Sequence, residues 1–452
     1  MILKKFLSAL TGVIITLSGA VSMNVYANNT PNEIISRNCP AYSGNENANP
    51  SFGNDEHYFS FWQSSSPDYL AYDLSGVNPE YRKKVIAVWY NTSAYDNIGM
   101  YVNRNMEPSD YTIEVNSAEG GEYPADGWKV VETVEGNTFS SRQHVVDMEG
   151  YNWIRINIQK ADDETGKQAS INFDVHNVSE GITDSWIFFG DSITAGGMNN
   201  CYGTGFATHV NMIDGKYFPI QENGGIGGIR SIDGKENIDR WLSTCPAKYV
   251  SIAYGTNDAW GNPGATEEYY NNTKYMIDKI IELGKVPVLP KIPSSTNADV
   301  KDNVPLYNAK VEQLYEEYGE KLVHGPDFAE FFEEHPDYLS ADGVHPNDTG
   351  YAEMRKLWAK TMYKNVYTAE NTDTPEDDIL YGDANDDGRV SISDSVAILQ
   401  HLANSSKYGL SKGGLSKGDV YNRGDGITGK DAYAITLLDA KVIDKLPITG
   451  EE

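Results

Sequence analysis

The sequence is poor in cysteine, which limits the ways in which the chain could be cross-linked. Its three cysteines, Cys39, Cys201 and Cys245, among 452 residues are too few for a disulfide scaffold. None of them has the Cys-x-x-Cys or Cys/His spacing of a zinc site. Cys201 and Cys245 fall in one predicted domain and could pair, a question that the sequence leaves open.

Positive charge is also scarce. Lys and Arg number 36 against 65 Asp and Glu, which gives a net charge of −29. This excess of acid argues against a nucleic acid or an anionic membrane as the partner, because both would repel the chain. It fits a soluble secreted protein that also uses acidic side chains to hold a metal ion.

Long apolar runs are confined to the N-terminus. Residues 1–27 contain Lys4 and Lys5, then an apolar stretch to about Met23 and a small-residue cleavage site that ends at Ala27. This order predicts a secretory signal peptide. A membrane anchor is the alternative, but Ser, Thr and Gly interrupt the run, and no later span is long enough to cross a bilayer. We therefore expect a secreted, extracellular protein.

The length of the chain allows about three domains. In residues 28–180, short runs of β-branched and aromatic residues lie between turn-rich loops. The runs are residues 69–74, 84–90, 111–115, 128–134, 153–159 and 170–175. They predict an antiparallel β-sandwich. Their order resembles the galactose-binding-like jelly rolls that precede catalytic modules in some carbohydrate esterases.

Four tryptophans of this region, Trp62, Trp89, Trp128 and Trp153, are candidates for stacking on sugar rings. Trp89 and Trp153 lie within apolar runs, so we expect them to fill the core. Trp128 follows an Asp-Gly turn and is the better candidate for exposure. Whether the sandwich binds glycan or only supports the next domain stays open.

Residues 181–367 alternate between strand and helix patterns. Strands are expected around Trp186, just before Asn223, and at residues 249–254, 286–289 and 322–324. Helices are expected at residues 206–213, 236–242, 266–283, 306–318 and 349–363. This alternation predicts a doubly wound parallel sheet. The chemistry of such a sheet gathers at the carboxyl ends of its strands.

Residues 185–197, SWIFFGDSITAGG, join a buried strand to a glycine-rich loop. Gly190 allows a sharp turn, so that Ser192 is presented at the carboxyl end of the strand. A serine there is a nucleophile only if a base takes its proton and donors hold the oxyanion. On this stretch alone, an ordinary serine between strand and loop is an equal alternative.

Three further motifs follow predicted strands or precede the last helix. They are residues 223–228 (Asn-Gly-Gly-Ile-Gly-Gly), 255–258 (Gly-Thr-Asn-Asp) and 342–345 (Asp-Gly-Val-His). Together with Gly190-Asp191-Ser192, they resemble the four signature blocks of the SGNH hydrolase superfamily, the GDSL-type esterases, in the family's order. One departure is Gly227, where such enzymes often have serine. The glycine run itself lacks the Lys-Ser/Thr of a P-loop.

The resemblance implies a serine esterase site that needs no cofactor. Ser192 would be the nucleophile, and His345 would move its proton. Asp342, three residues before His345, would orient the imidazole. The oxyanion hole would be formed by the backbone N–H groups of Ser192 and Gly228 and by the side-chain amide of Asn257, which could instead only brace its own turn.

The two remaining aspartates of the motifs, Asp191 and Asp258, are expected to hold loops. We do not expect them to take part in the chemistry.

The C-terminal part has a pattern of its own. Residues 368–379 are acidic and polar and predict a linker. In residues 380–448, a first loop has the spacing of calcium ligands, with Gly388 for the turn and a backbone carbonyl at Arg389. Its expected ligands are Asp383, Asn385, Asp387, Arg389, Ser391 and Asp394. An amphipathic helix with Val396, Leu399 and Leu402 follows.

A second loop begins at Asp419 and departs from this pattern. It is one residue too long, and Arg423 stands where an acidic ligand is expected. Its candidate ligands are Asp419, Asp425 and Asp431, and Asn422 is a further candidate. Two loop–helix repeats at a C-terminus resemble a type I dockerin, which binds the cohesin of a cellulosomal scaffoldin. The family's positions place Ile392 and Ser393 among the cohesin-binding residues.

The sequence thus favours a multidomain chain, with a β-sandwich, an α/β hydrolase domain and a small EF-hand-like helical module. Our hypothesis is a cellulosome-associated esterase that removes O-acetyl groups from plant cell-wall polysaccharide, xylan or mannan, with Ca²⁺ only in the C-terminal module. A general short-chain esterase or lipase is one alternative. A non-catalytic glycan-binding component is another.

Overall fold

The computed structural model describes residues 33–449, except 46, 56, 59, 92–105, 138, 140, 163–167, 200–203, 369–379, 386–388, 406, 424 and 425. The predicted signal peptide (residues 1–27), Cys201, almost all of the predicted linker, Asp387, Gly388 and Asp425 therefore lie outside the described residues. Cys39 and Cys245 carry free thiols. Among the described residues, no helix combines the length and the hydropathy of a membrane span.

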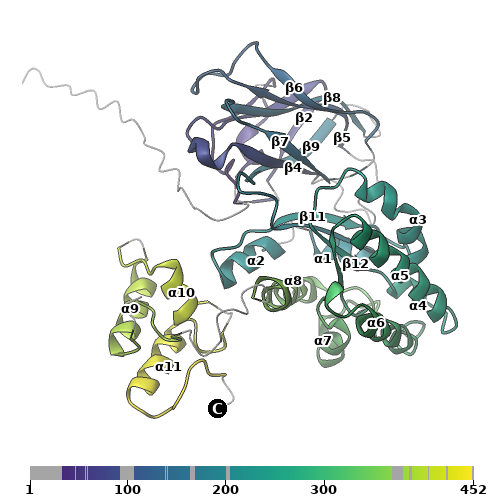
Figure 1. Cartoon of the computed structure of the whole chain (residues 1–452), viewed down its shortest axis with the longest axis vertical. Helices are drawn as coiled ribbons and strands as arrows, with labels where there is room; N and C mark the ends of the chain where they lie inside the picture. The colour runs from purple at the N-terminus through teal and green to yellow at the C-terminus, as the bar shows by residue number, and fades with distance from the viewer. Residues whose placement is uncertain are drawn as a thin grey trace, which may run out of the picture.

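The N-terminal part contains two antiparallel sheets, which we call the β domain (Figure 1). One sheet has the strand order β1-β3-β8-β5-β6 and the other β2-β9-β4-β7. The strands are β1 (Ala41–Ser43), β2 (Trp62–Ser65), β3 (Asp68–Asp73), β4 (Lys84–Asn91), β5 (Glu107–Asn116), β6 (Lys129–Val134), β7 (Ser141–Asp147), β8 (Trp153–Asp162) and β9 (Gln168–Asn177). Two short 3-10 helices, Pro50–Gly53 and Pro79–Tyr81, lie in the loops.

The two sheets share one hydrophobic core. Tyr72 of β3 stacks on Phe173 of β9 at 5.5 Å between ring centroids. Trp89 of β4 meets Tyr111 of β5 edge to face and donates its indole N–H to the Tyr111 hydroxyl at 3.0 Å. All four rings are fully buried. The period-two pattern therefore predicts antiparallel strands correctly, although it misses β1, β2 and β7.

The four tryptophans of the β domain differ in surroundings. Trp62 and Trp89 are buried in the shared core, as expected for Trp89. Trp153 is buried too, but it packs on Tyr42 outside that core. Trp128 is half-buried, with the Arg155 guanidinium 4.2 Å from its ring centroid.

The middle part is an α/β domain around a five-stranded sheet of order β11-β10-β12-β13-β14, in which every neighbouring pair is parallel. The strands are β10 (Ser185–Gly190), β11 (Ile220–Gly225), β12 (Tyr249–Ala253), β13 (Val286–Leu289) and β14 (Val323–His324). The helices are α1 (Ser192–Gly197), α2 (Phe206–Ile213), α3 (Ser231–Leu242), α4 (Thr256–Ala259), α5 (Thr266–Glu282), α6 (Val304–Tyr318), α7 (Phe328–Glu334) and α8 (Asp348–Met362). Three short helical turns, Gly319–Lys321, Pro336–Tyr338 and Tyr363–Tyr367, complete it. The parallel α/β sheet predicted from the sequence is confirmed.

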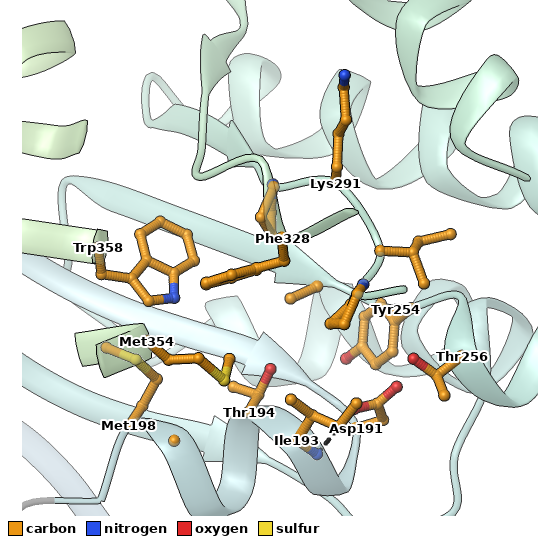
Figure 2. A pocket seen from close by; sticks show the side chains of 15 residues that line it. Asp191, Ile193, Thr194, Met198, Tyr254, Thr256, Lys291, Phe328, Met354 and Trp358 are labelled. Atoms are coloured by element: carbon orange, nitrogen blue, oxygen red, sulfur yellow. Dashed lines mark hydrogen bonds between the residues drawn. The ribbon is translucent and has the colours of Figure 1, made fainter. Parts of the chain in front are cut away.

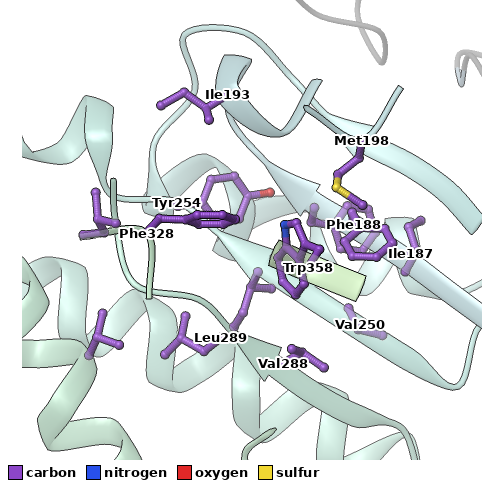
Figure 3. Packing of buried hydrophobic residues seen from close by; sticks show 14 of the residues in the cluster. Ile187, Phe188, Ile193, Met198, Val250, Tyr254, Val288, Leu289, Phe328 and Trp358 are labelled. Carbon is purple, nitrogen blue, oxygen red and sulfur yellow. The ribbon is translucent and has the colours of Figure 1, made fainter. Parts of the chain in front are cut away.

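Strand β10 lies inside this sheet and is buried along its whole length. Its alternate side chains point to opposite faces, as in any strand. Phe188 packs on Trp358 of α8 at 5.2 Å between ring centroids (Figure 3). Phe189 stacks instead on Trp241 of α3, also at 5.2 Å. Helices therefore cover both faces, and the run of four large apolar residues is explained by burial on both sides.

The β domain contacts the α/β domain along the edge strand β11. Tyr90 donates its hydroxyl to the Gln221 carbonyl oxygen at 2.7 Å, and Ser141 Oγ lies 3.2 Å from Glu222 Oε1. An apolar cluster of Ile86, Val88, Val178 and Ile220 adds to this contact. Figure 1 shows the β domain above β11, so the otherwise open edge of the parallel sheet is covered.

The C-terminal residues form three helices, α9 (Ile392–Ala403), α10 (Lys412–Gly418) and α11 (Gly429–Asp439). Their small core includes Ile398 of α9 and Ile435 of α11. Ser395 Oγ also donates a hydrogen bond to the Ala432 carbonyl oxygen at 2.8 Å. The apolar side chains Val396, Leu399 and Leu402 of the predicted amphipathic helix are exposed.

Candidate active site

Ser192 stands directly beyond the carboxyl end of β10, as the first residue of α1. The Asp191 side chain accepts the backbone N–H of Ile193 at 3.0 Å and so caps this helix. The stretch expected as a glycine-rich loop is therefore a short helix. Glycine is needed at position 190 for space, since a Cβ there would lie 2.1 Å from Thr194 Oγ1 and 2.7 Å from the Ala253 carbonyl oxygen.

The structure brings Ser192, His345 and Asp342 together. Ser192 Oγ lies 2.7 Å from His345 Nε2, although 153 positions separate the two residues in the chain. His345 Nδ1 lies 2.6 Å from Asp342 Oδ2. Because a carboxylate can only accept, Nδ1 carries the proton, and Nε2 is left to accept the Ser192 hydroxyl proton.

Asp342 is held as a carboxylate by several donors. Its Oδ1 accepts the backbone N–H groups of Val344 and His345 at 2.8 and 3.0 Å and the Ser340 hydroxyl at 2.8 Å. Partial burial alone would raise the pKa of Asp342, but these bonds and the His345 imidazole hold it well below its usual range. The group that faces the imidazole is therefore negatively charged at neutral pH.

A segment that the sequence did not single out holds the Asp342 loop in place. Ser295 Oγ and the backbone N–H of Thr296 donate to the Gly343 carbonyl oxygen at 2.6 and 2.9 Å. Asn297 Nδ2 donates to the Asp342 carbonyl oxygen at 3.0 Å. Gly343 has a φ of 72°, and a Cβ there would lie 2.5 Å from Thr296 Oγ1. We call residues 295–297 the clamp.

Two of the expected oxyanion donors lie on neighbouring elements. Gly228 follows β11, has a φ of 77° that favours glycine, and would direct a Cβ into open space. Asn257 lies in α4, and its Nδ2 donates one hydrogen bond to the Ile229 carbonyl oxygen at 2.9 Å. The amide has a second N–H, so this bond orients Asn257 and leaves a donor for a ligand.

The motif at 223–228 does not simply follow its strand, as the sequence suggested. Asn223 to Gly225 are the last three residues of β11. Asn223 is buried, donates to the Ala195 carbonyl oxygen at 2.9 Å, and accepts the Gly225 N–H at 2.9 Å. A Cβ on Gly225 would lie 2.2 Å from the Ala195 nitrogen, so this glycine allows α1 to approach β11.

The two aspartates expected to hold loops both hold helix ends. Asp258 accepts the Ser231 N–H at the start of α3, at 3.0 and 3.2 Å to its two oxygens. Asp191 is the cap of α1, and burial raises its pKa to about 7. Within the part of the chain that the structure describes, neither side chain is hydrogen-bonded to Ser192 Oγ or to His345, although the His345 imidazole acts on the Asp191 charge.

A small cavity is lined by Asp191, Ile193 and Thr194, which flank Ser192 in the chain, among other residues (Figure 2). Its lining is mainly apolar, with Met198, Phe328 and Trp358 among the side chains drawn in Figure 2. Asp191 and Tyr254 also face it, and the buried Tyr254 hydroxyl has no hydrogen-bond partner among the described residues. The cavity lies within the core beside the site, and Ser192 and His345 are not among its lining residues.

The calcium loops expected at the C-terminus place buried carboxylates at matching positions. Asp394 accepts the Asn385 and Ser391 N–H groups at 3.1 and 2.9 Å, and it pairs with Ser391 in a capping box of α9. Asp431 forms the same box with Thr428 at α11. The helix after each loop thus begins with the same capping box. In each helix, one carboxylate oxygen of the boxed aspartate, Asp394 or Asp431, accepts an N–H group from the preceding loop.

The first residue of each loop, Asp383 or Asp419, is also buried. Lys417 Nζ lies 2.8 Å from Asp383 Oδ2, a contact with which a bound cation would compete. Arg389 exposes its side chain, which leaves its backbone carbonyl as the expected ligand. Asp387 and Asp425 lie outside the described residues, and within the described ranges no three His, Cys, Asp or Glu side chains converge as a metal site.

The comparisons with known proteins concern different parts of the chain. Residues 188–353 match the GDSL-like Lipase/Acylhydrolase family. A xylanase/β-glucanase of Ruminococcus flavefaciens is 41% identical over 75 residues, and a multidomain esterase of the same organism is 25% identical over 174 residues. These alignments take in 15% and 35% of this chain, but only 9% and 22% of the two relatives' own lengths.

Similar solved structures include a variant of an acetyl xylan esterase from Geobacillus stearothermophilus, with 22% identity and a TM-score of 0.34. It covers 40% of this chain and 95% of its own. A GDSL-like lipase from Parabacteroides merdae has 25% identity and a TM-score of 0.33, with 41% and 95% covered.

The matched range begins within β10, includes the other four strands of the parallel sheet, and contains Ser192 and His345 with the hydrogen bond between them. The stretch of the chain that matches the GDSL-like Lipase/Acylhydrolase family therefore lies in the α/β domain, together with the candidate catalytic residues.

Proposed function

We propose that the chain is a secreted, extracellular serine esterase that removes O-acetyl groups from plant cell-wall polysaccharide, xylan or mannan, as part of a cellulosome. The observation that supports the chemistry best is the hydrogen-bonded series from Ser192 Oγ through His345 to Asp342, at 2.7 and 2.6 Å. A serine, an imidazole and a carboxylate in this order are the parts of a nucleophilic hydrolase.

The reaction proceeds in two halves. Ser192 Oγ attacks the ester carbonyl carbon while His345 Nε2 takes its proton. The tetrahedral intermediate collapses, the sugar hydroxyl leaves with the proton from His345, and an acetyl-serine remains. Water then attacks this ester with His345 again as the base, and acetate and free Ser192 are released. Asp342 stabilises the imidazolium in both halves.

The oxyanion of each intermediate is held by the N–H groups of Ser192 and Gly228 and by the amide of Asn257. Asn257 suits this role because its bond to the Ile229 carbonyl oxygen fixes the amide before substrate arrives. A preorganised donor of this kind lowers the barrier by about 3 kcal/mol.

Two observations favour plant cell-wall polysaccharide as the substrate. The relatives named above are a xylanase/β-glucanase and a multidomain esterase. The C-terminal repeats resemble a dockerin, which delivers enzymes to a scaffold on such material. Acetate as the acyl group follows from the resemblance to carbohydrate esterases.

The cohesin partner is supported by one face of α9. Ile392, Val396, Leu399 and Leu402 follow one another at helical spacing and are all exposed. Ser393 is exposed beside Ile392. An apolar stripe of this kind on a small module is suited to burial against a protein partner, and it includes the position Ile392 that the sequence predicted for cohesin binding.

Ca²⁺ is proposed as a structural ion of the C-terminal module and has no role in catalysis. Asp383, Asn385, Asp387, Ser391 and Asp394, with the Arg389 carbonyl, would hold it in the first loop; Asp419, Asp425 and Asp431 would serve the second. Removal of Ca²⁺ with EDTA should abolish binding to a cohesin in a pull-down and leave ester cleavage within about twofold. A matching loss of cleavage would contradict this separation.

The function is tested by acetate release from acetylated xylan and acetylated glucomannan, with the full chain and its Ser192→Ala variant. Release that disappears in the variant is expected, and the faster polymer identifies the substrate class. Cleavage of small aryl acetates without release from either polymer would support a general short-chain esterase instead. No cleavage of any ester would contradict the proposal.

A further inference from the structure

Trp260 is the one exposed tryptophan of this chain. All eight tryptophans fall within the described residues, and seven are buried or half-buried, namely Trp62, Trp89, Trp128, Trp153, Trp186, Trp241 and Trp358. Trp260 is 44% exposed. Because the other seven indoles are at least half-buried, the exposure of Trp260 suggests a binding role for this side chain.

The backbone around Trp260 is fixed on both sides. The Ala259 carbonyl oxygen accepts Asn303 Nδ2 at 2.8 Å, and the Gly261 N–H donates to the Asp299 carbonyl oxygen at 2.8 Å. The Tyr307 hydroxyl lies 2.9 Å from the Asp258 carbonyl oxygen and 2.8 Å from the Asn262 carbonyl oxygen, so its single proton is shared between, or given to one of, the two groups that flank this stretch. The indole therefore extends from a rigid support, which lowers the entropy lost when a ligand binds to it.

This support lies beside the proposed oxyanion hole. Asn257 is in α4, and Trp260 follows at the end of that helix, three positions later. The turn between them is helical, so the Cα of Trp260 lies about one helical turn from that of Asn257. A group stacked on Trp260 would therefore lie next to an ester whose oxygen is held by Asn257.

The surroundings of Trp260 favour an uncharged ligand with an apolar face. Among the described residues, no side chain forms an ion pair, hydrogen bond or ring contact with the indole. Residues 261–264 are exposed, and Gly261, with a φ of 61°, would direct a Cβ into open space. Leu306, in the same helix as Tyr307, is a second exposed apolar side chain near the support.

We propose that Trp260 is a stacking platform for one pyranose ring of a neutral polysaccharide, adjacent to the sugar that carries the ester. The C–H face of a pyranose matches the flat, uncharged indole, and its hydroxyl groups stay in water. The proposal rests on the polysaccharide function above and adds a subsite that positions the chain relative to Ser192 and Asn257.

The test compares two substrates in the full chain. Trp260→Ala should lower kcat/KM for an acetylated xylo- or manno-oligosaccharide about 3- to 10-fold, mainly through KM. It should leave hydrolysis of 4-nitrophenyl acetate, which has no sugar, within twofold. Trp260→Tyr should recover most of the loss, because it keeps an aromatic face. Phe52→Ala, which removes an equally exposed aromatic ring in the β domain, is the matched control and should change neither rate.

Inhibition by unacetylated oligosaccharide makes the test independent of deacetylation. Xylohexaose or mannohexaose should inhibit 4-nitrophenyl acetate hydrolysis by the wild type and do so several-fold more weakly in Trp260→Ala. If the polymers are not deacetylated but the oligosaccharides still inhibit Trp260→Ala more weakly than the wild type, the proposed substrate is wrong and the stacking role of Trp260 is supported. Equal inhibition of both proteins, no inhibition of either, or an equal loss on both substrates would overturn the platform.

Discussion

The two sides of the active site are held in place by different means. The Ser192 side is built by packing: β10 is buried along its length, α1 follows it directly, and glycines at 190 and 225 allow main chains to approach closely. The His345 side is a loop on the surface, held by hydrogen bonds from the clamp, residues 295–297. The nucleophile Ser192 is thus positioned by packing in the core. The base His345 is positioned by hydrogen bonds from the clamp to its loop, and single substitutions can remove these bonds one at a time.

The same difference appears in the two carboxylates. Asp191 is 2% exposed, and burial raises its pKa to about 7. The Asp342 side chain is 48% exposed and has a lowered pKa because donors surround it. A carboxylate that must orient an imidazolium needs its charge, whereas one that only caps a helix does not.

The largest effect is expected from the base side. Asp342→Asn should lower kcat about 10³- to 10⁴-fold, because an amide no longer fixes the His345 tautomer or stabilises the imidazolium. Steady-state kinetics with 4-nitrophenyl acetate measures this, with thermal unfolding as the control for folding. A kcat near that of the wild type would mean that another group orients His345.

A smaller effect is expected from the clamp. Ser295→Ala removes one bond to the Gly343 carbonyl oxygen and should lower kcat about 5- to 10-fold with little change in KM. Ser295→Thr keeps the hydroxyl and is the matched variant, which should retain most of the activity. Equal losses in both variants would indicate a packing defect rather than a positioning bond.

The smallest effect is expected from Asp191→Asn, and it concerns stability. Folding raises the pKa of Asp191 from 3.8 to about 7, so the folded state keeps a proton that the unfolded chain releases between these values. This group therefore makes the domain less stable as pH rises from about 4 to about 7. An asparagine can still accept the Ile193 N–H, so the variant should unfold at a higher temperature than the wild type at pH 8, with a smaller difference at pH 5.

Differential scanning calorimetry at pH 8 and at pH 5 measures the unfolding temperatures of the variant and the wild type. A variant that is less stable than the wild type at pH 8 would show that the Asp191 charge itself supports the cap.

Much of this fold could be predicted from the sequence because its long elements follow simple periods. Helix α2 and strand β13 fall at the predicted residues, and α5, α6 and α8 lie within two residues of theirs. The short helices α1, α4 and α7 were missed, since four to seven residues carry too little periodicity. Strand β7 alternates charged and apolar residues weakly and was missed for a similar reason.

The motif residues of the site could be named from their spacing, but their supports could not. Ser295 and Asn297 act through contacts with a loop almost 50 positions away, which no local pattern encodes. Trp260 is recognisable only once its exposure is known, because a tryptophan after a helix is usually packed. The exposed stripe of α9 likewise has the sequence pattern of a buried helix face.

The most direct test of the central claim is covalent labelling of the full chain with a fluorophosphonate, followed by peptide mass spectrometry. We expect one adduct, on Ser192, that forms in step with the loss of esterase activity. His345→Ala should suppress labelling, because the serine hydroxyl then has no base. An enzyme that loses activity through an adduct on another residue, or stays active with Ser192 fully labelled, would contradict the account.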